Sequence, residues 1–261
     1  MSTTPLTERA DRVAAAVKLH RAVARRRAAR FLAEGPNLVE AALRRGVVCE
    51  VFATAAARDR FGDLLGDAPV YEVTERAAKA LSDTVTPVGL VAVCRLPEVS
   101  LADVLTDARL VAVAVETSEP GNAGTLIRLA DAMGADAVVL AGDSVDPYNG
   151  KCLRSSAGSI FGVPVVQAQD TAELIAAMRG ARLQVLATTL DGETPLPAAD
   201  LSVPTAWLFG SEAHGLAPVV AAAADARVTI PMHGSAESLN VAAAAAICLY
   251  ASSQAVSRDQ A

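Results

Sequence analysis

Short apolar runs alternate with longer helical stretches in the part of the chain that begins at residue 108. The runs lie at residues 110–115, 137–140, 183–187 and 205–209. Strands that are apolar along their whole length are typical of a parallel sheet with helices on both faces. A last, alanine-rich helix is expected over residues 237–256. The pattern therefore predicts an α/β domain built on a parallel sheet.

A different pattern fills the first part of the chain. Apolar positions at helical spacing predict helix over most of residues 10–45, with an interruption at Gly35. Short strands are expected at residues 48–53, 70–73 and 88–94, and a helix at 55–65. We therefore expect a small α/β domain over residues 1–97, a linker over 98–107 and the second α/β domain over 108–261.

Charge is distributed unevenly along the chain. The whole sequence carries a net charge of −6, which alone argues against a nucleic-acid partner. Residues 1–45, however, contain ten basic and four acidic side chains, a net charge of +6 that leaves −12 for the rest. A basic end on an acidic body is typical of a protein that contacts a phosphate backbone, although a solvated basic helix would have the same charge. The candidate RNA-binding side chains in this region are Arg25, Arg26, Arg27 and Arg30.

Several classes of protein are not favoured by the sequence. The first 30 residues contain arginines instead of the apolar centre of a secretory signal, and no window reaches the roughly 18 apolar residues of a membrane span. We therefore expect a cytoplasmic protein with no membrane partner and no metal. The cysteines, which are too scattered for a zinc site or a disulfide framework and are interpreted as buried thiols, are Cys49, Cys94, Cys152 and Cys248.

The first candidate motif follows the strand expected to end at residue 115. A glycine-containing turn here carries Asn122, Gly124 and Arg128 and opens a helix. The free N–H groups of a first helical turn can bind an anion or a polar ligand. An ordinary strand-to-helix turn, with Asn122 as the helix cap and Arg128 exposed to solvent, would give the same pattern. Both interpretations stay open for this motif alone.

Two further glycine turns lie near expected strand ends. In one, Gly210 and Gly215 flank Glu212, so that the backbone can approach a ligand and the carboxylate can accept hydrogen bonds. In the other, Ser238 and Asn240 lie at the start of the last helix. Each turn could simply contain capping residues. Because ligands of open α/β sheets bind at the carboxyl ends of the strands, three such turns in one domain favour a binding site.

Other ligand-binding and catalytic classes fit poorly. No Gly-x-Gly-x-x-Gly fingerprint follows an expected strand, and the glycines at 210 and 215 are not followed by the Lys-Ser/Thr pair of a phosphate loop. The sequence also lacks the Gly-x-Ser-x-Gly elbow of many serine hydrolases. His214 and His233 are therefore interpreted as loop residues without a catalytic role.

Taken together, the three motifs resemble those of the SpoU (TrmH-like) methyltransferases of the SPOUT superfamily. The matching segments are Asn122-x-Gly124-x-x-x-Arg128, Phe209-Gly210-Ser211-Glu212-x-x-Gly215-Leu216 and Ile230-Pro231-Met232-x-Gly234-x-x-x-Ser238-Leu239-Asn240-Val241. The resemblance covers residues 108–255. Two positions depart from the family pattern, since Ala213 stands where glycine is frequent and Ala242 where serine is frequent. Residues 30–41 resemble, more weakly, part of the L30e-like domain that often precedes this catalytic domain.

The resemblance implies an S-adenosylmethionine-dependent ribose 2′-O-methyltransferase that acts on RNA. The overall layout is similar to the ribosomal RNA members of the family, including the thiostrepton-resistance type. It implies large-subunit ribosomal RNA as the substrate and RNA binding by the N-terminal domain. A deep trefoil knot is also implied, which pattern reasoning alone would not predict because knots are nearly absent from proteins. In this family a second subunit completes the active site, so a homodimer is expected.

The resemblance also implies roles for individual residues. The residues expected in the catalytic site are Asn122, Arg128, Glu212, Ser238 and Asn240. Those expected to hold the cofactor S-adenosylmethionine are Thr188, Leu208, Gly210, Gly215, Ile230, Met232 and Leu239. A basic segment between the first and second motifs adds Lys151 and Arg154 to the candidate RNA-binding residues.

The expected reaction places demands on the arginine of the first motif. A ribose hydroxyl is a weak nucleophile, so methyl transfer requires alignment with the methyl group and loss of a proton. Because guanidinium groups stay protonated in proteins, we interpret Arg128 as a clamp on the target phosphate that orients the hydroxyl, and not as a general base. Two alternatives stay open: a transfer RNA substrate, and a non-enzymatic RNA-binding protein that retains the fold.

Overall fold

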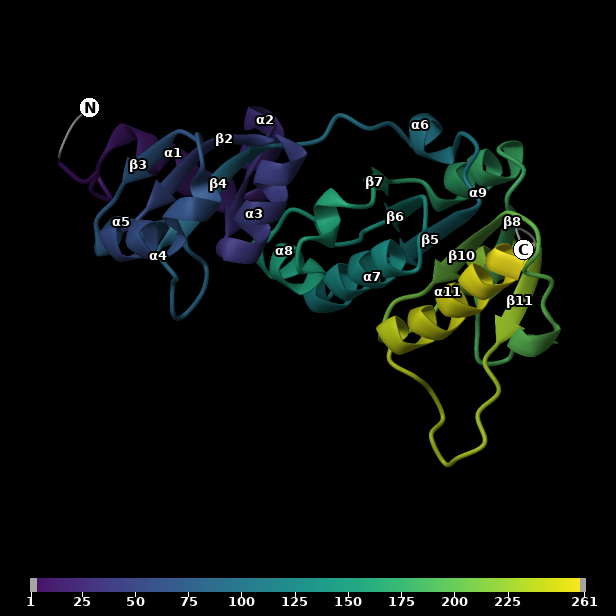
Figure 1. Ribbon diagram of the computed structural model, residues 1–261. Coiled ribbons are helices and arrows are strands. Elements are labelled where there is room, and N and C mark those ends of the chain that lie inside the picture. The colour runs from purple at the N-terminus through teal and green to yellow at the C-terminus, as the bar shows by residue number, and fades with distance from the viewer. Residues whose placement is uncertain (1–3, 259–261) are drawn as a thin grey trace. The chain divides into compact units, whose positions relative to one another are not determined.

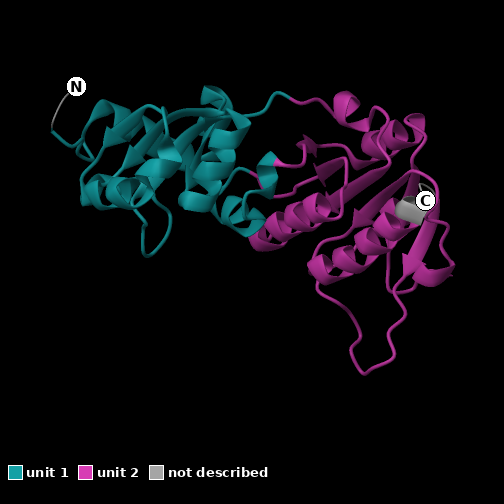
Figure 2. Cartoon of the chain, viewed as in Figure 1, with its two compact units in different colours: residues 1–98, 148–161 teal, residues 99–147, 162–261 magenta. Residues whose placement is uncertain are grey.

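The computed structural model describes residues 4–258, with side chains as far as Ala255. It divides into two compact units (Figure 2). Unit 1 comprises residues 1–98 and 148–161, and unit 2 comprises residues 99–147 and 162–261. Unit 1 is therefore discontinuous in sequence, because a short segment from the C-terminal part of the chain packs with the N-terminal domain.

Unit 1 contains a four-stranded sheet in the order β1-β4-β2-β3 (Figure 1). β4 runs antiparallel to β1 and β2, and β2 runs parallel to β3. The strands are β1 (Arg30–Glu34), β2 (Val48–Ala53), β3 (Val70–Glu72) and β4 (Leu90–Arg95). The helices are α1 (Asp11–Val17), η1 (Lys18–His20), α2 (Ala22–Ala28), α3 (Pro36–Arg45), α4 (Ala55–Leu65), α5 (Glu75–Leu81), α8 (Gly150–Ser156) and η2 (Ser159–Phe161). α1 and α5 pack on the sheet around Phe52, Leu81 and Val91.

Most elements expected for the N-terminal domain are present, but one strand is not predicted by the sequence pattern. The strands expected near 48–53, 70–73 and 88–94 and the helix at 55–65 are confirmed. The expectation of helix over most of residues 10–45 is wrong at β1. Ala29 adopts a left-handed conformation with φ 49° that ends α2, and Phe31 and Leu32 are buried where β1 pairs with β4. Tertiary pairing here overrides the local helical spacing.

Unit 2 contains a seven-stranded parallel sheet in the order β7-β6-β5-β10-β8-β11-β9, which confirms the predicted parallel sheet (Figure 1). Its strands are β5 (Leu110–Val115), β6 (Ala137–Ala141), β7 (Val165–Ala168), β8 (Gln184–Thr188), β9 (Thr194–Pro195), β10 (Thr205–Phe209) and β11 (Ala226–Thr229). Its helices are α6 (Leu101–Leu105), α7 (Pro120–Ala132), α9 (Thr171–Gly180), η3 (Leu196–Ala198), α10 (Pro218–Ala222) and α11 (Val241–Arg258). The short strands β7 and β9 are not predicted by the sequence pattern.

Helices cover both faces of this sheet. Successive side chains of a strand point to opposite faces. Leu208 of β10 lies in the core that includes Leu174 of α9, whereas its neighbour Trp207 donates a hydrogen bond from Nε1 to Ser252 Oγ of α11 at 2.9 Å. α11 also packs beside α7, against β5 and β10. The apolar character of the strands along their whole length follows from this double coverage.

The segment expected as a linker contains the short helix α6. Ser100 and Asp103 form a capping box at its start, in which Asp103 N–H donates to Ser100 Oγ and Ser100 N–H donates to the Asp103 carboxylate, both at 3.1 Å. Hydrogen bonds from the Ser100 side chain and backbone hold the pKa of the Asp103 carboxyl below its usual range. The helix belongs to unit 2, so that unit begins before the first strand of its sheet.

The cysteines are free thiols, and three of them are buried. Cys94, Cys152 and Cys248 are buried, and burial raises the pKa of the Cys248 thiol to about 12. Cys49 is partly exposed, next to a shift in the register between β2 and β4, so the expectation of a buried thiol is wrong there. Among the described residues, no group of three or more His, Cys, Asp or Glu side chains could hold a metal ion. Nor does any helix within 4–258 combine the length and apolar character needed to cross a membrane.

Arg25 has a structural role in unit 1. It is only 4% exposed, and its Nη1 donates to the carbonyl oxygens of Leu19 and His20, both at 2.9 Å. Arg26 and Arg27, on the same helix, are exposed. The expectation that Arg25 is available to RNA is therefore wrong, because its position on α2 points inward and its guanidinium holds the backbone of η1.

Replacing Arg25 with alanine should destabilise the protein by about 2–4 kcal/mol, because charge-assisted hydrogen bonds are lost and two carbonyl groups lose their donor. Arg26→Ala is the matched control. It should change the free energy of unfolding by less than about 0.5 kcal/mol, since that side chain is exposed. Chemical denaturation measures both values. Equally small changes in the two variants would contradict the structural role of Arg25.

Candidate active site

Three loops that follow parallel strands meet at one edge of the sheet in unit 2. β5 leads into α7, β10 into residues 210–217, and β11 into residues 230–240 before α11. β10 pairs with β5 so that Phe209 lies beside Ala114, and both strands therefore end at the same level. Because the carboxyl ends of parallel strands share an edge, segments far apart in sequence come together here.

Hydrogen bonds join one side chain from each of the three motifs. Asn122 Nδ2 donates to Glu212 Oε1 at 2.8 Å, and Asn240 Nδ2 donates to Asn122 Oδ1 at 3.3 Å. Asn240 also caps α11, since its Oδ1 accepts from the N–H of Ala242 at 2.9 Å. We call Asn122, Glu212 and Asn240 the polar triad. It shows that the three sequence motifs form one site.

The structure contradicts one part of the ordinary-turn interpretation of the first motif, the cap, and agrees with the other, the exposed arginine. Glu119, and not Asn122, is the N-cap of α7, and its carboxylate accepts from the N–H of Gly121 at 3.0 Å. The side chain of Asn122 is therefore available to the polar triad. Arg128, six residues further along α7, is exposed and does not belong to the triad.

A cavity of about 790 Å³ adjoins the polar triad. This volume lies within the range of about 300–1,000 Å³ that is typical of small-molecule sites. The predicted site residues that line it are Thr188, Gly210, Glu212, Gly215, Ile230, Met232, Ser238, Leu239 and Asn240. Leu208 does not line it but is buried in β10, where its carbonyl accepts from Thr188 Oγ1 at 2.7 Å. Asn122 and Arg128 lie outside the lining.

The loop after β10 is a tight turn that requires glycine at two positions. Ser211 and Gly215 exchange backbone hydrogen bonds of 3.1 and 2.9 Å, and Gly215 adopts a φ of 65°. A Cβ atom at Gly210 would overlap the backbone of Gly215. From the sequence alone, these glycines are expected to allow close approach to a ligand. The structure adds that they first allow the loop to fold on itself, which leaves Glu212 exposed at its tip.

The loop after β8 is held against β11 by an arginine that lies outside the three sequence motifs. Arg227 Nε lies 2.9 Å from Glu193 Oε2, and Arg227 Nη1 lies 3.2 Å from Asp191 Oδ2. Glu193 and Asp191 raise the pKa of the Arg227 guanidinium above its ordinary value. At Gly192 the loop passes so close that a Cβ atom would lie 2.7 Å from the carbonyl carbon of Val228. Arg227 and Asp191 both line the cavity, so the ion pairs of Arg227 shape one of its walls.

Two family models match the chain. Residues 109–250 match the SpoU rRNA Methylase family, and residues 10–92 match the MRM3-like substrate binding domain. The first match covers more than half of the chain. The chain belongs to the SpoU rRNA methylase family. The family predicted from the three motifs is thereby confirmed, and with it the class of reaction, which is methyl transfer to RNA.

Relatives and solved structures of SpoU methylases are similar to this chain along nearly its whole length. The 23S rRNA (guanosine(2553)-2′-O)-methyltransferase RlmP of Bacillus subtilis is 38% identical over 234 residues, which are 89% of this chain and 92% of the relative. An AdoMet-bound rRNA methyltransferase from Sinorhizobium meliloti has a TM-score of 0.84 at 29% identity, covering 96% of this chain and 97% of that one. The SpoU methyltransferase AviRb from Streptomyces viridochromogenes, in complex with AdoMet, has a TM-score of 0.84 at 28% identity, covering 96% and 100%.

Gly210→Ala should weaken the binding of S-adenosylmethionine by at least about tenfold, because the added methyl group would overlap the backbone of Gly215 and displace the tight turn. Gly180→Ala is the matched control, since nothing lies within 4 Å of the position of its Cβ and it ends α9 outside the cavity. Isothermal titration calorimetry measures both affinities. Equal affinities would show that the turn is not required for binding.

Arg227→Ala should weaken cofactor binding by about two- to fivefold, a modest effect because exposed ion pairs contribute little each. Glu193→Gln, which changes a partner outside the cavity lining, should shift the dissociation constant in the same direction. Arg179→Ala removes a comparable ion pair with Asp225 that does not border the cavity, and should leave the dissociation constant unchanged. If all three variants bind the cofactor with the same dissociation constant, the ion pairs of Arg227 do not shape the cavity wall.

Proposed function

We propose that the protein transfers the methyl group of S-adenosylmethionine to a ribose 2′-hydroxyl of 23S rRNA. The polar triad beside a cavity of about 790 Å³ is the observation that carries this proposal. The B. subtilis relative is named for 2′-O-methylation of a 23S rRNA guanosine, and the solved neighbours from S. meliloti and S. viridochromogenes hold AdoMet. A cavity of small-molecule size at the three motifs argues against a protein that only binds RNA.

The cavity fits S-adenosylmethionine in size and in chemistry. The apolar side chains of Ile230 and Leu239 suit an adenine ring, and backbone groups at the ends of β8 and β10 suit its polar edge. Gly210 and Gly215 keep their part of the wall free of side chains. The carboxylate of Glu212 favours a ligand that carries positive charge. When bound, S-adenosylmethionine supplies an electrophilic methyl group on a sulfonium.

Arg128 is assigned to the RNA. It is exposed on α7 and lies outside the cavity lining, so it suits contact with a large substrate better than contact with the cofactor. A guanidinium can hold a phosphate with two parallel hydrogen bonds, which orients the neighbouring ribose. The proton of the 2′-hydroxyl then passes to a phosphate oxygen or to water. Asn122 and Ser238 complete the catalytic set and orient the hydroxyl.

The trefoil knot is proposed from the resemblance to the SpoU family, and the strand order in unit 2 is compatible with it. β10 lies between β5 and β8 although β8 precedes it in the sequence, and α11 packs against α7, β5 and β10. A knot of this kind would hold the cavity loops together without a disulfide or a metal.

Unit 1 is assigned an L30e-like fold and the binding of RNA. Its residues 10–92 match a substrate-binding domain, and Arg26, Arg27, Arg30 and Lys151 are exposed. Arg154 forms ion pairs within unit 1, so we assign it to the fold of that unit and not to RNA. A homodimer, in which the second subunit completes the catalytic site, and action in the cytoplasm complete the proposal.

The purified protein should transfer labelled methyl groups from S-adenosylmethionine to 23S rRNA that lacks the modification, and not to transfer RNA. Primer extension at low nucleotide concentration, which stops at 2′-O-methylated residues, then maps the target. The nucleotide equivalent to guanosine 2553, named for the B. subtilis relative, is the first position to inspect. Transfer only to the transfer RNA pool would contradict the proposed substrate, and cofactor binding without transfer to any RNA would contradict the activity.

Arg128→Lys should reduce kcat by about tenfold or more but leave measurable methyl transfer, because lysine keeps the charge of the clamp and loses its two-point geometry. Arg109→Lys is the control, since Arg109 is also exposed in unit 2 and lies outside the site. Single-turnover assays with 23S rRNA measure both rates. Complete loss of transfer with unchanged RNA binding would contradict the clamp and favour a direct role in proton transfer.

A further inference from the structure

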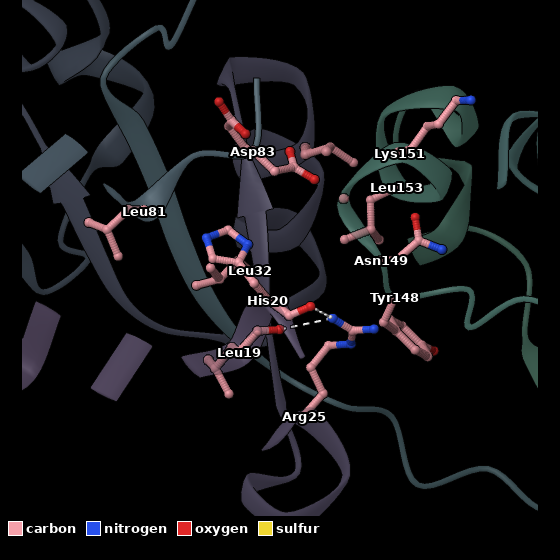
Figure 3. A pocket seen from close by; sticks show the side chains of 13 residues that line it. Leu19, His20, Arg25, Leu32, Leu81, Asp83, Tyr148, Asn149, Lys151 and Leu153 are labelled. Carbon is pink, nitrogen blue, oxygen red and sulfur yellow. Dashed lines mark hydrogen bonds between the residues drawn. The ribbon is translucent and has the colours of Figure 1, made fainter. Parts of the chain in front are cut away.

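Unit 1 contains a second cavity, of about 230 Å³, that the proposed reaction does not use (Figure 3). Its lining comes from η1, from β1, from the end of α5 and from residues 148–153. Residues 10–92 match the substrate-binding model, whereas residues 148–153 fall within the stretch that matches the methylase family. Segments assigned to two different family models therefore build this cavity together.

The inner wall of the cavity is apolar and partly aromatic. Leu32, Leu81 and Leu153 are each less than 10% exposed and line it. Tyr148 adds an aromatic ring, which packs against Phe31 with 4.8 Å between the ring centroids. Planar, largely apolar groups are therefore favoured in its interior.

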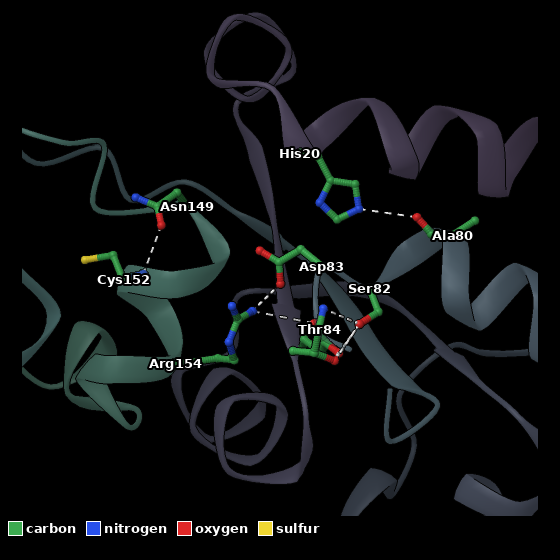
Figure 4. Close-up of polar contacts among 9 residues, drawn as sticks. His20, Ala80, Ser82, Asp83, Thr84, Asn149, Cys152 and Arg154 are labelled. Carbon is green, nitrogen blue, oxygen red and sulfur yellow. Dashed lines mark hydrogen bonds and ion pairs between the residues drawn. The ribbon is translucent and has the colours of Figure 1, made fainter. Parts of the chain in front are cut away.

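Buried and paired charges fix the shape of this cavity before any ligand binds. The guanidinium of Arg25 holds the carbonyl groups of Leu19 and His20, which form one wall (Figure 3). Arg154 forms an ion pair with Asp83, which lines the cavity (Figure 4). Arg154 also lies 3.7 Å from Glu34.

Hydrogen bonds extend these contacts. Glu34 accepts from Ser82 Oγ and, at 2.8 Å, from Thr84 Oγ1. A Cβ atom at Gly150 would overlap the carboxylate of Asp83, so glycine lets that carboxylate lie against the start of α8. The wall that joins the N-terminal domain to residues 148–153 is therefore built from specific contacts.

The charges decide between a phosphate and a base as the ligand. Glu34 and Asp83 both line the cavity and repel a phosphate, and Arg154 is already paired with them. Carboxylates accept hydrogen bonds from the amino groups of bases, as they do from cytosine. The volume lies below the range of about 300–1,000 Å³ typical of larger ligands, which suits a single base. Proteins recognise unstacked RNA bases by stacking on aromatic rings and by hydrogen bonds to their edges.

We propose that unit 1 holds one unstacked base of the RNA substrate in this cavity, and that the base carries an amino group that donates a hydrogen bond to the Asp83 carboxylate. Tyr148 supplies the stacking surface. Lys151, exposed beside the cavity, suits the phosphate of the same nucleotide. The inference rests on the proposed function in one respect, namely that RNA is the substrate, and it adds a determinant of which RNA is chosen.

Amide resonances of the full-length protein, titrated with single nucleotides, test the proposal. CMP, AMP or GMP should shift the amides of residues 19–20 and 148–153, and UMP, which has no amino group, should bind at least about fivefold more weakly. No shift at these amides with any nucleotide at about 10 mM, or equal shifts with inorganic phosphate alone, would overturn the proposal. Equal binding of UMP would overturn the role of the amino group.

Variants separate a binding role from a structural one. Tyr148→Leu should abolish the shifts, and Tyr148→Phe, which keeps the ring, should retain them. Asp83→Asn exchanges an acceptor for a donor and should move the preference toward UMP, whereas Asp63→Asn on the exposed side of α4 should not. An unchanged preference in Asp83→Asn would contradict the assigned contact. S-adenosylmethionine added to the same samples shifts amides of unit 2, so a failure of the proposed methyl transfer is observed separately.

Discussion

Insertion of β10 between β5 and β8 is the arrangement on which the core and the active site of unit 2 both depend. The strand pairs in parallel with each neighbour, and its alternate side chains enter the cores on the two faces of the sheet. Through the hydrogen bond from Trp207 to Ser252, β10 also fixes α11. β10 therefore positions Glu212, which lies in the loop after this strand, and also Asn240, which lies at the start of α11. Two of the three members of the polar triad are positioned by this one strand.

The polar triad is itself weakly held, and its geometry comes from the strands beneath it. Its two hydrogen bonds are exposed, and such bonds contribute about 0.5–1.5 kcal/mol each. Residues 231–240, which carry Ser238 and Asn240, are exposed along their whole length. A site of this kind combines a rigid base with a rim that is accessible to a large substrate. This division suits an enzyme that must receive both a small cofactor and an RNA.

The sequence predicts those elements and motifs that a short stretch of the chain identifies by its own residue pattern. Apolar runs predict most strands of unit 2. The order of the three motifs and their places after strands indicate one site. β1 has no such signal, because its burial depends on pairing with β4, about 60 residues away. The roles of Arg25, Arg154 and Arg227 were not predictable for a related reason. An arginine's sequence neighbours do not reveal whether it points to solvent, to backbone carbonyls or to carboxylates from another part of the chain.

The discontinuity of unit 1 changes how the two parts of the protein can be separated. The chain crosses between the units after residues 98, 147 and 161, so three connections join them where a conventional pair of domains has one. Residues 148–161 lie between β6 and β7 of the methylase sheet in sequence, yet Arg154 pairs with Asp83 of the N-terminal domain. Exchanging residues 1–98 for those of a relative would therefore preserve this ion pair only if the relative supplies an acidic residue in place of Asp83. Residues 148–161 must therefore match the N-terminal domain that they complete, although they fall within the stretch that matches the methylase family.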